Sequence, residues 1–310
     1  MDGARLRCGR STACWGSVRV SIDIPNFRVL SKLGDGAGSS IYLVRDVRSG
    51  ARYAVKNVKV HSPEDMKLVD QLKDEYETGR LLDHPVIRKV FDLRYVRRRL
   101  RVKSAMLFME YVDGVPMNSP DFSRSIPDLL QLFLRAAEGL TAMHRAGFVH
   151  ADLKPGNLLV TPTEDLKLID LGQSSPLNQP KSRIQGTIDY IAPEQANLEK
   201  LDQRTDVFGL GATLYKVLTG KSIPTDMNQT VSHISTRWLG KRVDERNEEF
   251  TAGPMPTPVE RFIDACCQKE PARRLPDMRA VSERLELART ILLRHEDEPR
   301  VQRSAPRVPS

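Results

Sequence analysis

Four polar side chains stand on one short turn in residues 149–160, VHADLKPGNLLV, between two apolar runs. They are His150, Asp152, Lys154 and Asn157, and the turn itself is marked by Pro155 and Gly156. A lone aspartate in such a place is most often a turn or helix-cap residue. A carboxylate, an ammonium and a carboxamide together instead indicate a loop that holds a general base among groups that bind charge.

A second carboxylate follows closely, because Asp170 ends the apolar run in LKLIDLG, residues 166–172. One carboxylate and one carboxamide oxygen suit Mg²⁺, which keeps several waters and takes its other ligands from substrate phosphates. Asn157 and Asp170 are therefore predicted metal ligands, with Mn²⁺ as an alternative ion. Asp152 is then free to act as the base.

A glycine cluster, Gly34, Gly36 and Gly38, lies between two runs that are typical of strands. A dinucleotide-binding turn would open a helix, whereas residues 41–44 favour a strand. The cluster is either an ordinary hairpin turn or a flap whose backbone N–H groups close over phosphates. The later sequence TGKS, residues 219–222, is not a phosphate-binding loop, because Tyr215 stands where its leading glycine is needed.

Lys56 ends the apolar run YAVK, residues 53–56. Alone, such a lysine would simply extend into solvent. The helical pattern that follows offers Glu75 and Glu77, and a buried glutamate there would pair with Lys56 and hold it towards phosphate oxygens.

The elements that must position these residues fall into two groups. Strand patterns at 27–34, 39–47, 51–60, 88–96 and 104–112 enclose one helical pattern at 64–82. Helical patterns follow at 128–145, 205–218, 259–268 and 281–293. We predict an α+β fold with two lobes: a small antiparallel sheet with one helix, a larger and mainly helical part, and a nucleotide cleft between them.

The predicted boundaries are a flexible extension over residues 1–26, a first lobe over 27–112, a second lobe over 113–294 and a disordered basic tail over 295–310. The chain has 310 residues, a net charge of +8 and 40% hydrophobic residues, enough for such a core. It shows no apolar run of about 18 residues and no secretory signal, so we expect a cytoplasmic protein without a membrane span.

Composition also bears on two classes of partner and site. Four cysteines, Cys8, Cys14, Cys266 and Cys267, have neither zinc-site spacing nor the density of a disulfide scaffold. Arginines are scattered and aromatic residues make up only 6% of the chain, so no nucleic-acid binding is expected.

With these motifs in place, the sequence resembles the eukaryotic-type Ser/Thr protein kinases, in their bacterial form. The resemblance covers residues 27–294, and seven motifs stand in the family's order. They are the glycine loop, AVK, HADLKPGN, DLG, APE at 192–194, DVFGLG at 206–211 and KEPARR at 269–274. The resemblance implies transfer of the γ-phosphate of ATP, with Mg²⁺, to Ser or Thr hydroxyls of protein substrates, including the enzyme itself.

The resemblance also implies roles for single residues. Lys56 would contact the α- and β-phosphates and pair with Glu75, Asp152 would orient the acceptor hydroxyl, and Lys154 would steady the γ-phosphate. The implied nucleotide-binding residues are Leu33, Gly34, Asp35, Gly36, Ala37, Gly38, Ser39, Ile41, Ala54, Lys56, Met109, Glu110, Val112 and Leu159. Ile41, Ala54 and Leu159 would sandwich the adenine, residues 110–112 would form the hinge beside it, and Met109 would lie behind it. A Glu194–Arg274 ion pair and an Asp206 brace below the catalytic loop would be structural.

Several positions depart from the family pattern or need an account of their own. Ala151 replaces an arginine that commonly binds a phosphorylated activation loop, so we expect activity without that phosphorylation, although Ser174, Ser175, Ser182 and Thr187 are candidate autophosphorylation sites. Gly79 stands one turn after Glu75, where a bulky apolar residue would help to fix the helix, and predicts a mobile helix.

The basic run 94–103 is either a docking patch for an acidic partner or, more commonly, a solvated hairpin.

Two other functions remain open at this level. A small-molecule phosphotransferase of related fold gains slight support from the missing arginine, but the APE segment argues against it. A pseudokinase scaffold would ordinarily have lost Lys56, Asp152, Asn157 or Asp170, and all four are present.

Overall fold

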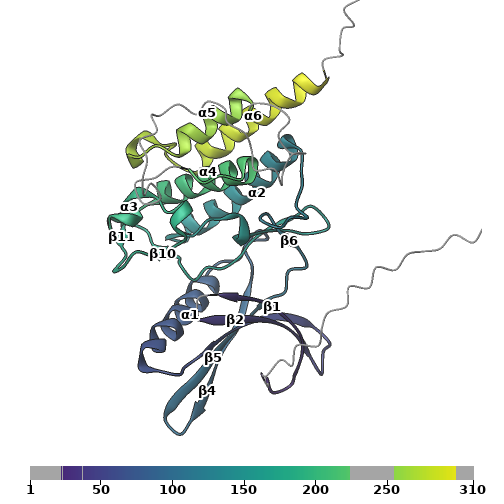
Figure 1. Cartoon of the computed structure of the whole chain (residues 1–310), viewed down its shortest axis with the longest axis vertical. Helices are drawn as coiled ribbons and strands as arrows, with labels where there is room; N and C mark the ends of the chain where they lie inside the picture. Colours follow the sequence, from purple (N-terminus) through teal and green to yellow (C-terminus); the bar gives the residue numbers. More distant parts are fainter. Residues whose placement is uncertain (1–21, 23, 37, 224–254, 298–310) are drawn as a thin grey trace, which may run out of the picture.

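Two lobes make up the protein in the computed structural model, which describes residues 22, 24–36, 38–223 and 255–297 (Figure 1). The first lobe is an antiparallel sheet with one helix against it, and the second is mainly helical. This is the predicted α+β arrangement. The extension and tail predicted at the two ends fall almost wholly outside the described residues.

The sheet of the first lobe has the strand order β1-β2-β3-β5-β4. Its strands are β1 (Phe27–Gly36), β2 (Ser39–Asp46), β3 (Arg52–Lys59), β4 (Val90–Arg98) and β5 (Arg101–Glu110). The interior strands β3 and β5 contribute side chains to an apolar cluster on each face of the sheet. On one face Ala54 and Leu107 pack with Leu72 of helix α1 (Met66–Gly79). On the other, Val55 and Phe108 belong to a separate apolar cluster.

Helix α1 is shorter than the helical pattern predicted. The three residues Pro63–Asp65 form a tighter 3-10 turn, in which the Asp65 carboxylate accepts hydrogen bonds from the backbone N–H groups of His61 and Ser62, both at 2.8 Å. The helix proper therefore begins at Met66 and ends at Gly79.

Gly79 lies where α1 approaches strand β4. A methyl group at this position would lie 2.8 Å from Cγ2 of Val90, 2.9 Å from its Cγ1 and 3.4 Å from Cδ1 of Leu171. The space that a larger side chain would fill is thus already occupied. Glycine here permits close packing of the helix on the sheet, while the mobility of α1 stays a prediction.

The hairpin of β4 and β5 is longer than predicted. The ladder extends to the pair Arg98 and Arg101, with Arg99 and Leu100 at the turn. The basic run therefore forms the far end of this hairpin, whose register shifts between Val96 and Arg97 and which projects away from the helical lobe (Figure 1).

The helical lobe is built around α2 (Ile126–Arg145), whose residues Leu129, Phe133 and Leu140 are completely buried. Ser125 caps the start of α2, accepting a hydrogen bond from the backbone N–H of Asp128. The other helices are α3 (Pro193–Ala196), α4 (Gln203–Thr219), α5 (Thr257–Cys266) and α6 (Met278–Asp297). Among the described helices, none is both long and apolar enough to cross a membrane.

The second lobe also contains short strands. They are β6 (Val115–Pro116), β7 (Phe148–Val149), β8 (Leu158–Val160), β9 (Leu166–Leu168), β10 (Ser175–Pro176), β11 (Gln179–Pro180) and β12 (Lys200–Leu201). The pairings β6-β8-β9, β7-β10 and β11-β12 fix the loops between them. The polar turn 150–157 leaves β7 and enters β8, so both of its ends are held.

Candidate active site

The polar turn is held from below by a buried carboxylate on α4. Asp206 Oδ2 accepts a hydrogen bond from the backbone N–H of His150 (2.8 Å), and Oδ1 accepts one from that of Ala151 (2.9 Å). His144 Nε2 lies 2.8 Å from Oδ2. Burial alone would raise the pKa of Asp206, but the His144 contact and the backbone donors bring the pKa below its ordinary value. The predicted brace is present.

Ala151 adopts a left-handed backbone conformation (φ 58°), which is strained for a residue other than glycine. Its carbonyl accepts a hydrogen bond from Gln195 Nε2 (2.9 Å), a contact that the sequence did not indicate. Its methyl group lies in a small apolar cluster with Val149 and Leu201, against which Leu177 packs. The position of Ala151 is therefore apolar and filled.

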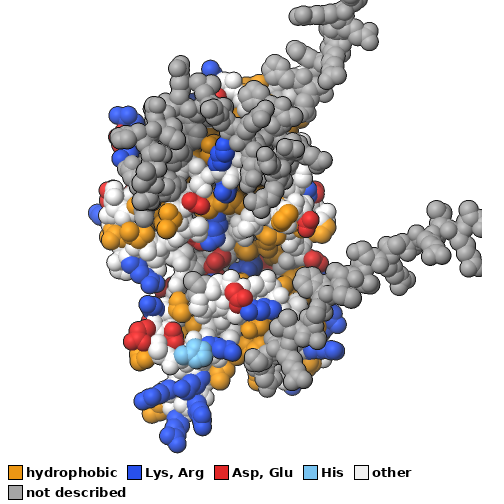
Figure 2. Space-filling model, viewed as in Figure 1, with side chains coloured by type: hydrophobic (Ala, Val, Ile, Leu, Met, Phe, Trp, Pro, Cys, Tyr) orange, Lys and Arg blue, Asp and Glu red, His pale blue; other side chains and the backbone are white. Residues whose placement is uncertain are grey.

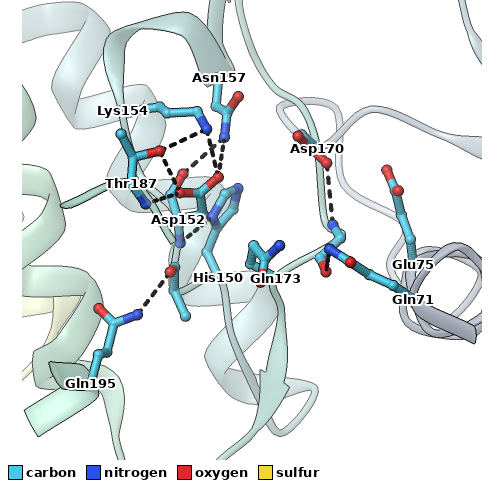
Figure 3. Close-up of polar contacts among 12 residues, drawn as sticks. Gln71, Glu75, His150, Asp152, Lys154, Asn157, Asp170, Gln173, Thr187 and Gln195 are labelled. Carbon is cyan, nitrogen blue, oxygen red and sulfur yellow. Dashed lines mark hydrogen bonds and ion pairs between the residues drawn. The ribbon is translucent and has the colours of Figure 1, made fainter. Parts of the chain in front are cut away.

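Asp152 is the centre of a network of donors (Figure 3). Its Oδ2 accepts from Lys154 Nζ (2.8 Å) and from Asn157 Nδ2 (3.3 Å). Its Oδ1 accepts from the backbone N–H (3.0 Å) and the hydroxyl (3.1 Å) of Thr187. The Thr187 hydroxyl also accepts from Lys154 Nζ (3.0 Å). This network aligns both oxygens of a nearly buried carboxylate.

Sequence reasoning missed the contact of Thr187 with Asp152, because the sequence offered this residue as an autophosphorylation site and, with Gly186, as part of a peptide-binding segment. Thr187 lies 35 positions after Asp152, and nothing local in the sequence brings the two together. The nearest signal was the Gly186–Thr187 pair ahead of the APE motif.

The two predicted metal ligands each present an oxygen atom without a protein donor. Asn157 Nδ2 donates to the backbone carbonyl of Asp152 (2.8 Å), which fixes the amide and leaves its Oδ1 accepting nothing from the described residues. Asp170 uses Oδ1 for Lys56 (2.9 Å), and its Oδ2 is likewise unengaged within the described part of the chain. One carboxylate and one carboxamide oxygen fit Mg²⁺, which takes further ligands from water and phosphate.

Lys56 pairs with one carboxylate in each lobe, and its contact with Asp170 joins the lobes. Its ammonium lies 2.7 Å from Glu75 Oε2 and 2.9 Å from Asp170 Oδ1. Burial alone would lower the pKa of Lys56, but the two carboxylates raise the pKa above its ordinary value. Lys56, in turn, lowers the pKa of Asp170 against the effect of burial. Glu77 instead pairs with Lys73 on the exposed face of α1, so Glu75 is the inward-facing glutamate.

Two further residues, neither predicted, hold α1 in this inward position. The Arg88 guanidinium is nearly buried and lies 3.7 Å from the second oxygen of Glu75, while its backbone N–H donates to Leu168 (2.9 Å). Gln71 Nε2 donates to the backbone carbonyl of Gly172 (2.9 Å), directly after the DLG motif. Both are distant in sequence from their partners, and the helical pattern gave no sign of them.

The glycine loop is the turn between β1 and β2. Gly38 has φ 78°, and a methyl group on it would clash with Cδ1 of Leu68 on α1. The Asp35 carboxylate accepts from the Ser40 hydroxyl (2.8 Å) and pairs with Lys32 (2.6 Å). Gly34, Gly36 and Ser39 lie in the flanking strand ends, Leu33 is half exposed beside them, and Ala37 lies outside the described residues.

The residues predicted around adenine lie on adjoining strands. The register pairs Ile41 with Lys56 and Ala54 with Met109, so β2, β3 and β5 bring them side by side. Met109 is completely buried. From the other lobe, β8 carries Leu159.

Glu110 and Val112 lie at the connection between the lobes. The Glu110 carboxylate pairs with Lys167 of β9 (2.8 Å), and its backbone N–H donates to Lys89 (2.9 Å). Among described groups none accepts from the backbone N–H of Val112, which leaves it available to a ligand.

The segment after Asp170 contributes a partly buried cation, Lys181. The Lys181 ammonium donates to the backbone carbonyl of Gln173. Burial lowers the pKa of Lys181 to about 8, and the nearby carboxylates of Asp152 and Asp206 only partly offset that effect. Lys181 thus lies near the carboxylates of the catalytic turn and of its brace.

Comparison with known sequences agrees with this geometry. The family model described as "Protein kinase domain" matches residues 27–285, well over half of the chain. This chain belongs to the protein kinase family.

The kinase resembles curated bacterial enzymes over part of their length. It is 32% identical over 214 residues to serine/threonine-protein kinase PknA of Mycobacterium tuberculosis, covering 66% of this chain and 49% of the relative. It is 30% identical over 197 residues to serine/threonine-protein kinase PknB of Mycobacterium leprae, covering 61% of this chain and 32% of the relative. It therefore spans about half or less of the relatives' length.

The helical lobe of the kinase contains the predicted ion pair behind the APE motif. Arg274 donates to both oxygens of Glu194, each at 2.8 Å, and both side chains are buried. Thr205 donates to the same carboxylate (2.9 Å), and the guanidinium stacks on Phe208. This cluster fixes the end of the segment that carries Thr187.

Proposed function

We propose that the kinase transfers the γ-phosphate of ATP to Ser or Thr hydroxyls of proteins, itself included. The observation that carries the proposal is the network of Asp152, Lys154 and Thr187, in which a carboxylate is aligned by an ammonium and a hydroxyl from the activation segment. Protein kinases as a family use ATP and a divalent metal ion.

Asp152 accepts the proton of the attacking hydroxyl and orients that hydroxyl for in-line attack. Lys154, bound to the same carboxylate, lies where the transferred phosphoryl group would gain negative charge. Lys56 holds the phosphates of the nucleotide and is itself held by Glu75. Phosphoryl transfer needs little covalent chemistry from a protein, so positioning and charge neutralisation are sufficient.

Asn157 and Asp170 would hold Mg²⁺ through their unengaged oxygens, with Mn²⁺ as a substitute. When bound, the ion neutralises charge on the phosphate oxygens. In the protein, Asn157 stays in place because its amide donates to the backbone of Asp152.

The nucleotide would lie between β2, β3 and β8. Ile41 and Ala54 would contact the adenine from the sheet side and Leu159 from the helical side, with Met109 behind it. Because the backbone N–H of Glu110 is already bonded to Lys89, the N–H of Val112 is the hinge donor left for the ring. The glycine loop, Leu33 to Ser39, would cover the phosphates.

We propose further that activity does not depend on phosphorylation of the activation segment. The apolar cluster at Ala151 offers no arginine to a phosphate. The segment is instead held by the β7-β10 and β11-β12 pairings and by Lys181. Phosphatase-treated and untreated kinase should have similar activity, and a large loss on treatment would contradict this.

A small-molecule phosphotransferase is the alternative. Incorporation of labelled phosphate from ATP should occur on a generic basic protein and on the kinase, with label mapped to Ser and Thr. A panel of free alcohols should accept little. Label on the alcohols and none on protein would refute the protein-kinase proposal.

The cytoplasm remains the predicted compartment, and protein substrates remain the predicted partners.

A further inference from the structure

The far end of the β4–β5 hairpin carries basic side chains, most of which form no ion pair with the described residues. Residues 94–103 hold six Lys or Arg residues and no Asp or Glu. Arg94 is engaged by Asp92 and by the Phe108 ring, and Arg97 stacks on Tyr95. The remaining four are exposed and have no ion-pair partner among the described residues: Arg98, Arg99, Arg101 and Lys103. Figure 2 shows this group as a blue projection at one end of the molecule.

The tip of the same hairpin is apolar. Leu100 is 98% exposed, more than any other large hydrophobic side chain among the described residues, and Val96 is 44% exposed on the adjoining strand. A single exposed leucine is ordinary on a protein surface. Here it lies at the outermost point of a convex projection, between arginines on both sides, with nothing of the described protein packed on it.

The turn itself departs from what hairpin turns favour. Its two central positions are Arg99 and Leu100, where asparagine and glycine are favoured, and Arg99 has a φ of 56°. A left-handed conformation is unfavourable for a residue that carries a side chain. These two residues make the turn less stable than asparagine and glycine would. We take this local departure from the favoured turn residues as a sign that their exposed side chains have a function.

We propose that this tip, Arg98 to Lys103, is a binding site for the surface of an anionic phospholipid membrane. Four unpaired cations match the charge of anionic headgroups, and Leu100 reaches the boundary between headgroups and acyl chains. A nucleic acid or an acidic protein segment would satisfy the arginines but would leave Leu100 in water. A convex tip also offers no groove in which a peptide could lie.

The location suits this role. The hairpin projects from the sheet on the side away from the helical lobe, so the active site stays open to substrates when the tip is bound (Figure 1). None of the tip residues contacts Lys56, Asp152 or Asp170. The inference therefore stands whether or not the proposed protein-kinase activity is correct.

The test is co-sedimentation of the full chain with vesicles of phosphatidylcholine, with and without phosphatidylserine. We expect binding only to the vesicles that contain phosphatidylserine, and weakening by salt. Arg98→Ser and Arg101→Ser should each lower the affinity about fivefold, the factor that corresponds to about 1 kcal/mol per basic residue at such a surface. Leu100→Ser should lower it about tenfold, because a partly inserted leucine loses its apolar contact.

The matched control is Arg284→Ser/Leu287→Ser on the exposed face of α6, which removes the same residue types from the other lobe. It should bind vesicles like the wild type, and all variants should keep wild-type circular dichroism. The proposal is overturned if the wild type does not bind phosphatidylserine vesicles, or if Leu100→Ser binds them as well as the wild type does. It is also overturned if duplex DNA or polyglutamate displaces the vesicles and binds the wild type and Leu100→Ser equally well.

Discussion

Packing at Gly79 gives a prediction that opposes simple helix propensity. In an open helix interior, Gly→Ala stabilises by up to about 1 kcal/mol. Here the added methyl group would lie 2.8 and 2.9 Å from the two methyl groups of Val90, which real side chains do not tolerate without movement. Gly79→Ala must therefore shift α1 away from β4 or rotate Val90.

Overpacking of this kind costs about 1–3 kcal/mol, more than the gain in propensity. We expect Gly79→Ala to destabilise the kinase by about 1–2 kcal/mol, a loss of a few degrees in melting temperature for a domain of this size. Gly79→Leu should be worse, because the larger side chain has nowhere to go. Thermal unfolding followed by circular dichroism measures the effect.

The sharper assay is a double-mutant cycle with Val90. Val90→Ala alone removes two methyl groups from the contact and should cost about 1.6 kcal/mol or more, since a cavity remains. In Gly79→Ala/Val90→Ala the new methyl group occupies part of that cavity. The double variant should therefore be more stable than the sum of the two single effects, by about 1 kcal/mol or more.

Gly34→Ala is the matched control, because a methyl group at Gly34 meets no atom within 4 Å. It should leave the melting temperature nearly unchanged. A Gly79→Ala variant as stable as the wild type or more stable, or additive effects of Gly79→Ala and Val90→Ala, would contradict a clash with Val90.

Three other predictions follow from single contacts. Arg274→Ala leaves the buried Glu194 carboxylate without its main partner and should destabilise the helical lobe by about 3–5 kcal/mol in thermal unfolding; a shift near zero would contradict this. Thr187→Val removes a hydroxyl from Asp152 and should lower kcat by about 10- to 100-fold at little cost in the KM for ATP, and Thr187→Ser should restore it; equal defects in both variants would argue for a packing role. Because burial lowers the folded-state pKa of Lys181 to about 8, below its unfolded value, the unfolded chain binds more protons between those pKa values. Wild-type stability relative to Lys181→Met should therefore rise as the pH rises above 8, and a pH-independent difference would show that Lys181 does not titrate there.

The sequence was sufficient for the elements and motifs that are local. The polar turn at Asp152, the strand that ends at Lys56 and the run before Asp170 each have a signature of a few residues, and the structure brings them together. Periodicity also placed the main helices, with ends that moved where a 3-10 turn at Pro63–Asp65 replaced the first helical residues.

The contacts between distant elements could not be predicted from the sequence. Thr187 and Gln195 join the catalytic turn only because the activation segment folds back over it. In the sequence Arg88 is one residue of a connecting loop, and only the fold brings its side chain beside Glu75. The packing at Gly79 was unforeseen for the same reason, because one helical pattern cannot show that Val90 of another element fills the space beside it.

The central claim is that Asp152 positions and deprotonates the acceptor hydroxyl in a kinase otherwise able to bind ATP. The most direct measurement is transfer of labelled γ-phosphate to a basic protein by the wild type and by Asp152→Asn, with nucleotide binding measured in parallel. Asp165→Asn, an exposed aspartate in the β8–β9 turn, is the control. We predict that Asp152→Asn binds ATP like the wild type but loses transfer by about 100-fold or more, while Asp165→Asn transfers normally. Undiminished transfer by Asp152→Asn, or no transfer by a wild type that binds ATP, would contradict the account.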